Sequence, residues 1–298
     1  MKILLFGCNG QVGWELQRSL APLGELVALD FDSKDFAADF SRPQELAASV
    51  RAVRPDVIVN AAAHTAVDKA ESEPDLAHTI NAEAPGVLAR EAAASNIWLV
   101  HYSTDYVFDG SGTRPWREDD PTGPLSVYGR TKLDGEQRIR ASGCRHLILR
   151  TSWVYAARGG NFARTMLKLA AERDELRVID DQIGAPTGAD LLADVTAHAL
   201  RAAMPKPELA GTYHAVAAGE TSWHGYAQTV IEWARARSLP VRVAADRIVA
   251  VSSSAYPTPA RRPLNSRLDT QRLQRTFGLT MPPWQPGVLR MLAEVHGR

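Results

Sequence analysis

The chain has 298 residues, and its 34 lysines and arginines balance its 34 aspartates and glutamates, so the formal net charge is zero. A protein that binds nucleic acid usually carries a basic excess toward the phosphates, so this balance argues against nucleic acid as a partner. Hydrophobic residues make up 45% of the chain and charged residues 23%, which excludes intrinsic disorder as the main state.

Cysteine usage and hydropathy point to a cytoplasmic protein with no membrane partner. Cys8 and Cys144 are the only cysteines, too few for a disulfide framework, and no zinc-ligand spacing occurs. The apolar run at residues 3–6 is much shorter than the core of a signal peptide. No segment approaches the roughly 18 apolar residues of a membrane span. We therefore expect the cytoplasm as the location.

Short runs of Val, Ile and Leu alternate with amphipathic stretches in the first half of the chain. The runs do not alternate with polar residues, as is typical of strands buried on both faces. Strand, helix, strand, helix at this rhythm predicts parallel strands with crossover helices, an α/β fold with a Rossmann-type doubly wound sheet. The predicted strands are 3–6, 25–30, 57–60, 97–102 and 147–151, and the predicted helices are 11–22, 43–53, 81–95 and 128–141.

The second half has more Pro and Gly between its predicted helices, at 161–172, 188–203, 222–238 and 287–296. This texture predicts a smaller, loop-rich domain. We expect a dinucleotide-binding domain at 1–150 and a mainly substrate-binding domain at 151–298. The helix near 188–203 is expected to rejoin the first domain.

A glycine-rich loop joins the first predicted strand to the first predicted helix. Gly7, Gly10 and Gly13 allow a tight turn, a close approach of the backbone to a pyrophosphate, and close packing of helix on strand. The helix N-terminus offers free N–H groups to the phosphates. Asp30 ends the second predicted strand, where a carboxylate accepts hydrogen bonds from a ribose hydroxyl. Asp30 favours NADH, because a carboxylate there would repel the 2′-phosphate of NADPH. Lys34 lies close in sequence and would weaken that repulsion, so the choice between NADH and NADPH stays open.

Tyr128 and Lys132 stand four residues apart at the start of a predicted helix and therefore share one face. An ammonium beside the phenol is expected to lower the tyrosine pKa toward neutrality, so that the tyrosine can exchange a proton with a substrate oxygen. Thr104 follows a predicted strand, at the end where parallel sheets bind ligands. We expect Thr104 to hydrogen-bond the reacting carbonyl, and Ser103 is the competing candidate.

The chain resembles the extended short-chain dehydrogenase/reductases and, within them, the dTDP-4-dehydrorhamnose reductase family. The resemblance runs from end to end. Its motifs are NAAAHTAVD at 60–68, STDYVFDG at 103–110, YGRTK at 128–132, RTSWVY at 150–155, DQIGAPT at 181–187 and YPTPARRP at 256–263. The last three are much more specific than the signatures of the wider superfamily.

The resemblance implies that NADPH or NADH reduces the C4 ketone of dTDP-6-deoxy-L-lyxo-4-hexulose to give dTDP-L-rhamnose. Tyr128 would be the general acid, and Lys132 would be its electrostatic partner and a ligand of the nicotinamide ribose. Thr104 would be the hydroxyl that adjusts the pKa of Tyr128. The implied cofactor-binding residues are Gly7, Gly10, Gln11, Val12, Gly13, Asp30, Asp39, Phe40, Ala63, His64, Thr65, Tyr102, Tyr128 and Lys132, and the implied sugar contacts are Thr104, Asp105 and Trp153. A homodimer is expected, and Mg²⁺ is associated with the family, although its ligands are unknown.

Other interpretations stay open for several residues. His64 fits a buried histidine at a strand end, and Trp153 fits a filler between domains. Arg261 and Arg262 fit either a diphosphate clamp or solvated loop charges. Asn81 is interpreted as a helix N-cap.

Three other functions share this fold. A 4,6-dehydratase needs a carboxylate after Asp105, where this chain has Tyr106. A 4-epimerase shows no net oxidation of its cofactor, and the sequence excludes it less firmly. A non-catalytic regulatory subunit on the same scaffold would be free to lose Thr104, Tyr128 and Lys132, all of which are present.

Overall fold

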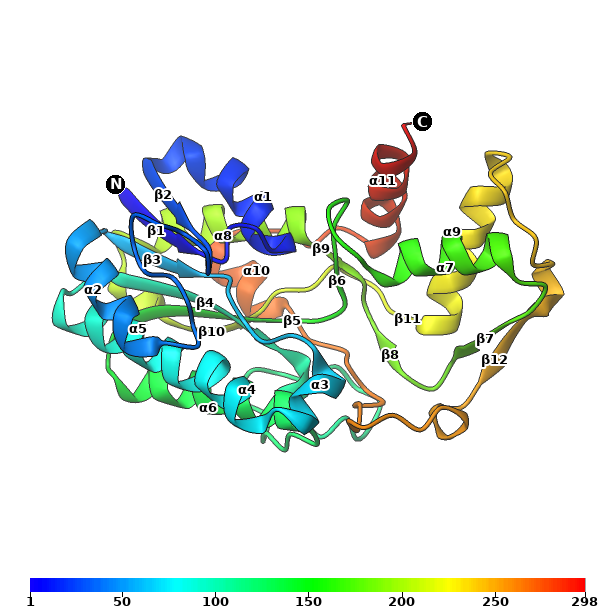
Figure 1. The fold of residues 1–298 in the computed structure, drawn as a ribbon, viewed down its shortest axis with the longest axis horizontal. Coiled ribbons are helices and arrows are strands. Elements are labelled where there is room, and N and C mark those ends of the chain that lie inside the picture. The colour runs from blue at the N-terminus through cyan, green and yellow to red at the C-terminus, as the bar shows by residue number, and fades with distance from the viewer. Residues whose placement is uncertain (298) are drawn as a thin grey trace.

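The computed structural model describes residues 1–297, and they form two lobes along the long axis of the molecule (Figure 1). The larger lobe is built on a six-stranded sheet of strand order β10-β5-β4-β3-β1-β2. Every neighbouring pair in it is parallel. This confirms the predicted doubly wound α/β fold. The strands are β1 (Lys2–Phe6), β2 (Glu25–Leu29), β3 (Val57–Asn60), β4 (Trp98–Thr104), β5 (Arg145–Thr151) and β10 (Gly211–His214).

Alternating side chains of the strands supply a separate core on each face of the sheet. Ile3 and Leu5 of β1 pack with the helices of one face, and Leu4 and Phe6 pack with those of the other. The first face is covered by α1 (Gln11–Leu20), α8 (Ala189–Ala203) and α10 (Gln271–Phe277), and the second by α2 (Pro43–Val53), α5 (Ala84–Ala94) and α6 (Val127–Ala141).

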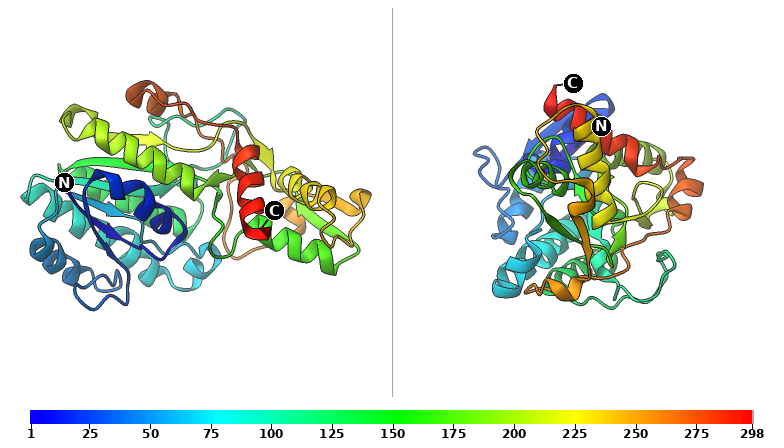
Figure 2. Two further views of the ribbon diagram at one scale, coloured as in Figure 1. Left: turned by 90° about the horizontal axis from the view of Figure 1, so that it is seen from above. Right: turned by 90° about the vertical axis from the view of Figure 1, so that its right-hand side faces the viewer.

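The smaller lobe has its own apolar core, formed mainly by three helices and a parallel pair of strands. They are α7 (Phe162–Glu172), α9 (Trp223–Ala236), α11 (Trp284–His296), β7 (Leu176–Ile179) and β12 (Ile248–Val251). Two short strand pairs lie between the lobes, β6 (Val154–Tyr155) with β9 (Thr187–Gly188) and β8 (Ile183–Gly184) with β11 (Thr221–Ser222). Figure 2 shows the two lobes from above, with α11 near their junction.

The chain beyond residue 150 contributes to both lobes. Helix α8 packs along α1, and β10 forms one edge of the large sheet. The division into a domain of residues 1–150 and a domain of residues 151–298 therefore stays a prediction. Among the described residues, no helix is long and apolar enough to cross a membrane.

Helix boundaries follow local capping and differ from the predictions mainly after β3. Helix α6 begins after Ser126, whose hydroxyl accepts a hydrogen bond from the N–H of Gly129. The predicted helix at 81–95 begins only at Ala84, after one π-helical turn. The sequence analysis did not predict this turn, η2 (Thr79–Glu83), or the short helices α3 (Val67–Ser72) and α4 (Pro74–His78). Short 3₁₀ turns are η1 (Ala21–Leu23), η3 (Asp105–Val107), η4 (Pro207–Leu209), η5 (Ala245–Arg247) and η6 (Ser253–Ala255).

Candidate active site

The glycine-rich loop lies between β1 and α1 and leaves no room for side chains at two of its glycines. Gly7 has φ of +79°, and a Cβ there would lie 2.7 Å from the amide nitrogen of Ala62. A Cβ on Gly13 would lie 1.9 Å from the carbonyl oxygen of Gly7. Gly10 caps α1 without a side-chain hydrogen bond, which leaves the first N–H groups of the helix available. This backbone cradle fits the diphosphate of a dinucleotide.

Asp30 holds the glycine-rich loop against the end of β2. Its two carboxylate oxygens accept hydrogen bonds from the N–H groups of Asn9 and Phe31, each at 2.8 Å. A carboxylate has about four acceptor positions, so Asp30 keeps capacity for a ribose hydroxyl. Asp39 accepts hydrogen bonds from Ser41, which lower the pKa of that carboxyl. The Phe40 side chain is buried and packs edge-on against Phe6 at 5.5 Å between ring centroids.

The segment after β3 carries Ala63, His64 and Thr65 and is held by Asn81. The Asn81 side chain accepts a hydrogen bond from the His64 N–H at 2.9 Å and donates one to the His64 carbonyl at 3.1 Å. It also donates to the hydroxyl of Thr131 on α6. The interpretation of Asn81 as a helix N-cap is wrong, because it lies inside the π-helical turn. A π turn directs side chains differently from an α-helix, and the sequence pattern gave no signal for it.

Tyr128 and Thr104 come together at the end of β4. Burial raises the pKa of Tyr128 to about 12, the nearby Asp105 adds to this rise, and the neighbouring Thr104 hydroxyl opposes it. The expected lowering of the tyrosine pKa is therefore wrong for this structure. The physical reason is that burial disfavours the phenolate more than its neighbours stabilise it. Tyr128 consequently keeps its proton near neutral pH.

Lys132 lies on α6, one turn after Tyr128, but its amino nitrogen is bonded to β4. Lys132 Nζ donates to the carbonyl oxygen of Tyr102 at 2.6 Å and lies 3.2 Å from Nε2 of His101. Burial lowers the pKa of Lys132 to about 8, although the carboxylate of Glu136 favours the ammonium. Tyr102 itself directs its hydroxyl to Thr196 on α8, at 2.5 Å. The sequence analysis did not single out His101, which lies inside the predicted strand at 97–102.

Ser103, the competing hydroxyl, is committed to a buried ion pair. Its Oγ donates to the Glu136 carboxylate at 2.5 Å, and Arg150 forms two further hydrogen bonds to the same carboxylate, at 2.9 and 2.7 Å. These bonds hold the pKa of Glu136 below its usual value despite its burial. Of the two candidates, Thr104 is the one that the structure brings to Tyr128.

Asp105 follows Thr104 directly and is 2% exposed. Burial raises the pKa of its carboxyl to about 6, while hydrogen bonds from Ser266 and Thr104 oppose this rise. The Thr104 hydroxyl donates to Asp105 Oδ1 at 3.1 Å. A buried carboxylate favours a hydrogen-bond donor as its neighbour.

A cleft of about 760 Å³ opens between the segment after η3 and the segment at 253–264. Its lining includes Gln182, Arg261 and Arg262. Arg262 forms hydrogen bonds to both carboxylate oxygens of Asp68, at 3.0 and 2.7 Å, so it ties its segment to α3. The size fits a small organic ligand.

Trp153 has an unusual backbone conformation, with φ of +47°. Its ring stacks on Trp223 at 3.7 Å between centroids. Trp223 in turn donates to the side-chain oxygen of Gln182, one of the residues that line the cleft. A bulky residue held at positive φ is costly and is typical of functional sites.

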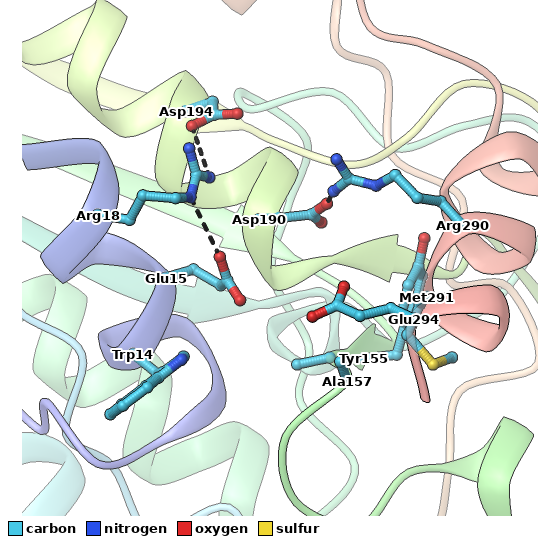
Figure 3. Close-up of a pocket in the computed structure, with 11 residues that line it drawn as sticks. Trp14, Glu15, Arg18, Tyr155, Ala157, Asp190, Asp194, Arg290, Met291 and Glu294 are labelled. Carbon is cyan, nitrogen blue, oxygen red and sulfur yellow. Dashed lines mark hydrogen bonds and ion pairs between the residues drawn. The ribbon is translucent and has the colours of Figure 1, made fainter. Parts of the chain in front are cut away.

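A second cavity, of about 460 Å³, lies between α1, α8 and α11 (Figure 3). It is lined by several acidic side chains, but two arginines approach them. Arg18 pairs with Asp194 and Glu15, and Arg290 pairs with Asp190. Within residues 1–297, no group of three or more His, Cys, Asp or Glu side chains is placed to hold a metal ion. The Mg²⁺ associated with the family therefore has no candidate ligands here.

Comparisons with known proteins cover the whole chain. The family model described as "RmlD substrate binding domain" matches residues 1–296. The dTDP-4-dehydrorhamnose reductase of Escherichia coli (strain K12) is 59% identical over 99% of this chain and 98% of its own length.

Solved structures of related proteins show the same fold. A dTDP-4-dehydrorhamnose reductase from Clostridium acetobutylicum has a TM-score of 0.88 at 34% identity, covering 99% of this chain and 100% of its own. One from Bacillus anthracis, in complex with NADP, has a TM-score of 0.86 at 33% identity, covering 98% of this chain and 99% of its own.

Proposed function

Since this chain belongs to the dTDP-4-dehydrorhamnose reductase family of nicotinamide-dependent oxidoreductases, we propose that it reduces the C4 ketone of dTDP-6-deoxy-L-lyxo-4-hexulose to dTDP-L-rhamnose. The observation that carries the proposal is that Thr104 and Tyr128 lie next to each other. The pair lies at the carboxyl end of β4, where parallel sheets bind ligands. It supplies a protonated phenol beside a second hydroxyl, which meets the need for a proton donor when a carbonyl group is reduced.

The residues of the glycine-rich loop fit a nicotinamide dinucleotide, with Gly7, Gly10, Gln11, Val12 and Gly13 as its diphosphate site. The remaining proposed contacts come from β2 and the segments after β2 and β3, namely Asp30, Asp39, Phe40, Ala63, His64 and Thr65, and from Tyr102 and Lys132. A bound reduced nicotinamide supplies the hydride for the reaction.

Tyr128 then donates its phenolic proton to the carbonyl oxygen, on which negative charge develops. Because the pKa of Tyr128 is raised to about 12, the proton is in place before the reaction. Thr104 hydrogen-bonds the same oxygen and orients the phenol. Lys132 contributes positive charge below its pKa of about 8 and stabilises the developing phenolate.

Substrate binding is assigned to Thr104, Asp105 and Trp153. Asp105 would accept a hydrogen bond from a sugar hydroxyl, and Trp153, which stacks on Trp223, would contribute an aromatic ring to the sugar site. Arg261 lines the cleft and is the nearer candidate for the substrate diphosphate, because Arg262 is paired with Asp68.

The other functions of this fold are distinguished by their chemistry. Tyr106 follows Asp105, so the carboxylate for water elimination in a dehydratase is absent from that position. A 4-epimerase would interconvert sugars without net consumption of cofactor. A regulatory subunit would bind the cofactor without turnover.

The choice between NADPH and NADH, the homodimer and the cytoplasmic location remain predictions. Asp30 disfavours a 2′-phosphate by charge, whereas the Bacillus anthracis relative is described in complex with NADP. Rates with both cofactors, and the mass of the protein measured by light scattering after size-exclusion chromatography, test the first two.

The test of the proposed function follows nicotinamide absorbance after the protein is mixed with the 4-keto sugar and either reduced cofactor. We expect loss of one equivalent of reduced cofactor for each dTDP-L-rhamnose identified by NMR. A C4 epimer formed without net cofactor loss would support an epimerase, and binding without any product would support the regulatory subunit.

A further inference from the structure

His101 lies between Lys132 and Asn60 in the centre of the large sheet. Its Nε2 is 3.2 Å from Lys132 Nζ, and its Nδ1 is 3.0 Å from Asn60 Nδ2. The exposed fractions are 0% for His101, 1% for Asn60 and 2% for Lys132. Water therefore has little access to this row of three nitrogen-bearing side chains, and they must satisfy one another.

The orientation of the Asn60 amide is set by the backbone. Asn60 Oδ1 accepts a hydrogen bond from the N–H of Ala62 at 3.0 Å. If the amide were turned over, its NH₂ group would face that N–H, and two donors would oppose each other. Asn60 therefore directs its NH₂ group at His101 and donates to Nδ1.

This donation determines the tautomer of His101. Burial and the positive charge of Lys132 hold the pKa of the imidazole well below its usual value, so the ring is neutral and carries one N–H. Since Nδ1 accepts from Asn60, the proton is on Nε2 and points at Lys132 Nζ. An amine accepts that hydrogen bond, but an ammonium has no lone pair with which to accept it.

We propose that Asn60 and His101 are positioning residues for Lys132, which fix the place of its amino nitrogen and restrict the number of protons it holds. In the amine form, Nζ accepts from His101, donates to Tyr102 and keeps one N–H for a ligand. In the ammonium form, His101 must change tautomer and lose the hydrogen bond from Asn60. Protonation of Lys132 is thereby coupled to Asn60, which lies on a different strand.

The other groups around Lys132 do not provide this restriction. Glu136, one turn further along α6, favours the ammonium, and Arg150 of β5 neutralises part of that effect by pairing with Glu136. His146 of β5 lowers the pKa of His101 further. Tyr128 on α6 and Tyr102 on β4 are neutral near pH 7, because burial raises the pKa of both phenols. Asp105 in η3 acts on Tyr128.

The first test reads the tautomer directly and needs no turnover. The full-length protein is labelled with ¹⁵N-histidine, and its ring nitrogen shifts are recorded, since these distinguish a protonated from a bare nitrogen. The His101 signals are identified by their loss in His101→Gln. Above about pH 9, where Lys132 is an amine, we expect His101 with its proton on Nε2 in the wild type and on Nδ1 in Asn60→Asp, because a carboxylate accepts from Nδ1–H and still accepts from Ala62. A wild-type proton on Nδ1 at this pH overturns the proposal.

The second test rests on the proposed function and measures the rate against pH. Asn60→Asp makes Nε2 an acceptor for the ammonium, so the fall in kcat at high pH is expected to move up by about one to two pH units. The same substitution in a His101→Leu background controls for the added charge. A shift of equal size without the imidazole overturns the proposal, as does an unchanged profile.

These two readouts separate the proposal from the proposed function. If the protein does not reduce the 4-keto sugar, the tautomer measurement still decides whether Asn60 controls His101. Thermal unfolding of each variant identifies any loss of fold, and the wild-type spectrum alone can refute the assignment.

Discussion

Lys132 Nζ lies 2.6 Å from the carbonyl oxygen of Tyr102, so α6 and β4 are joined through the lysine on which the proposed chemistry depends. The four-residue spacing from Tyr128 suggested a direct effect of the ammonium on the phenol. The structure instead places the amino nitrogen between the Tyr102 carbonyl and the His101 ring of β4, in a buried position that weakens its hold on a proton. The pH behaviour of the enzyme should therefore follow Lys132 more than Tyr128.

The rate of reduction is expected to fall above about pH 8. Burial lowers the pKa of Lys132 to about 8, so its positive charge is present below that pH and is lost above it. Tyr128, with a pKa raised to about 12, stays protonated throughout this range. The measurement is kcat/KM between pH 6 and 10, and a rate that stays constant to pH 10 would contradict the role of Lys132.

Thr104→Val should lower kcat by about 10- to 100-fold, because it removes the hydroxyl beside Tyr128 while keeping the shape of the side chain. Thr104→Ser keeps the hydroxyl and is the matched control, expected to retain most of the activity. Equal losses in both variants would show that packing at this position matters and the hydroxyl does not.

Gly13→Ala should weaken cofactor binding by at least about tenfold, because the new Cβ would lie 1.9 Å from the carbonyl oxygen of Gly7 and displace the loop. Gly211→Ala on the edge strand β10 is the control, since its Cβ would meet nothing closer than 3.7 Å. Fluorescence titration with reduced cofactor measures both. Unchanged affinity in Gly13→Ala would remove the loop from the binding site.

Arg150→Met should lower the free energy of unfolding by about 3–5 kcal/mol at pH 7, because it leaves the Glu136 carboxylate buried and without its main partner. This difference in the free energy of unfolding between wild type and variant should shrink below about pH 4. Glu136 is then protonated in the unfolded chain, so the stability that its lowered pKa gives the wild-type fold is lost. Arg242→Met, which removes the partner of the exposed Asp174, is the control and should change stability little. Denaturant unfolding measures the free energy of unfolding of the wild type and of both variants.

The parts of the fold and site that the sequence predicted are those carried by local patterns. The strand of residues 3–6, the glycines that follow it and the helix after them form one contiguous signal, and the structure has each of them in place. Thr104 and Tyr128 were paired by reasoning about strand ends and helix starts, and they do meet. Local residue patterns suffice when each element is long and its neighbours are fixed by the parallel sheet.

What the sequence could not predict depends on side chains brought together from distant segments. His101 and Asn60 come from different strands and became partners only through the register of β3 with β4, in which they are paired. The π-helical turn that directs Asn81 to His64 has no sequence signature. The pKa of Tyr128 was predicted with the wrong sign because burial, which dominates it, depends on the assembled fold.

The central claim, that Tyr128 protonates the substrate oxygen, is tested most directly by a single turnover of the enzyme with bound reduced cofactor and dTDP-6-deoxy-L-lyxo-4-hexulose. In Tyr128→Phe the oxidation of the cofactor should slow by about 10²- to 10⁴-fold, with cofactor binding retained. Tyr226→Phe, in the core of the smaller lobe, is the control and should react at the wild-type rate. Oxidation at the wild-type rate in Tyr128→Phe would contradict the account.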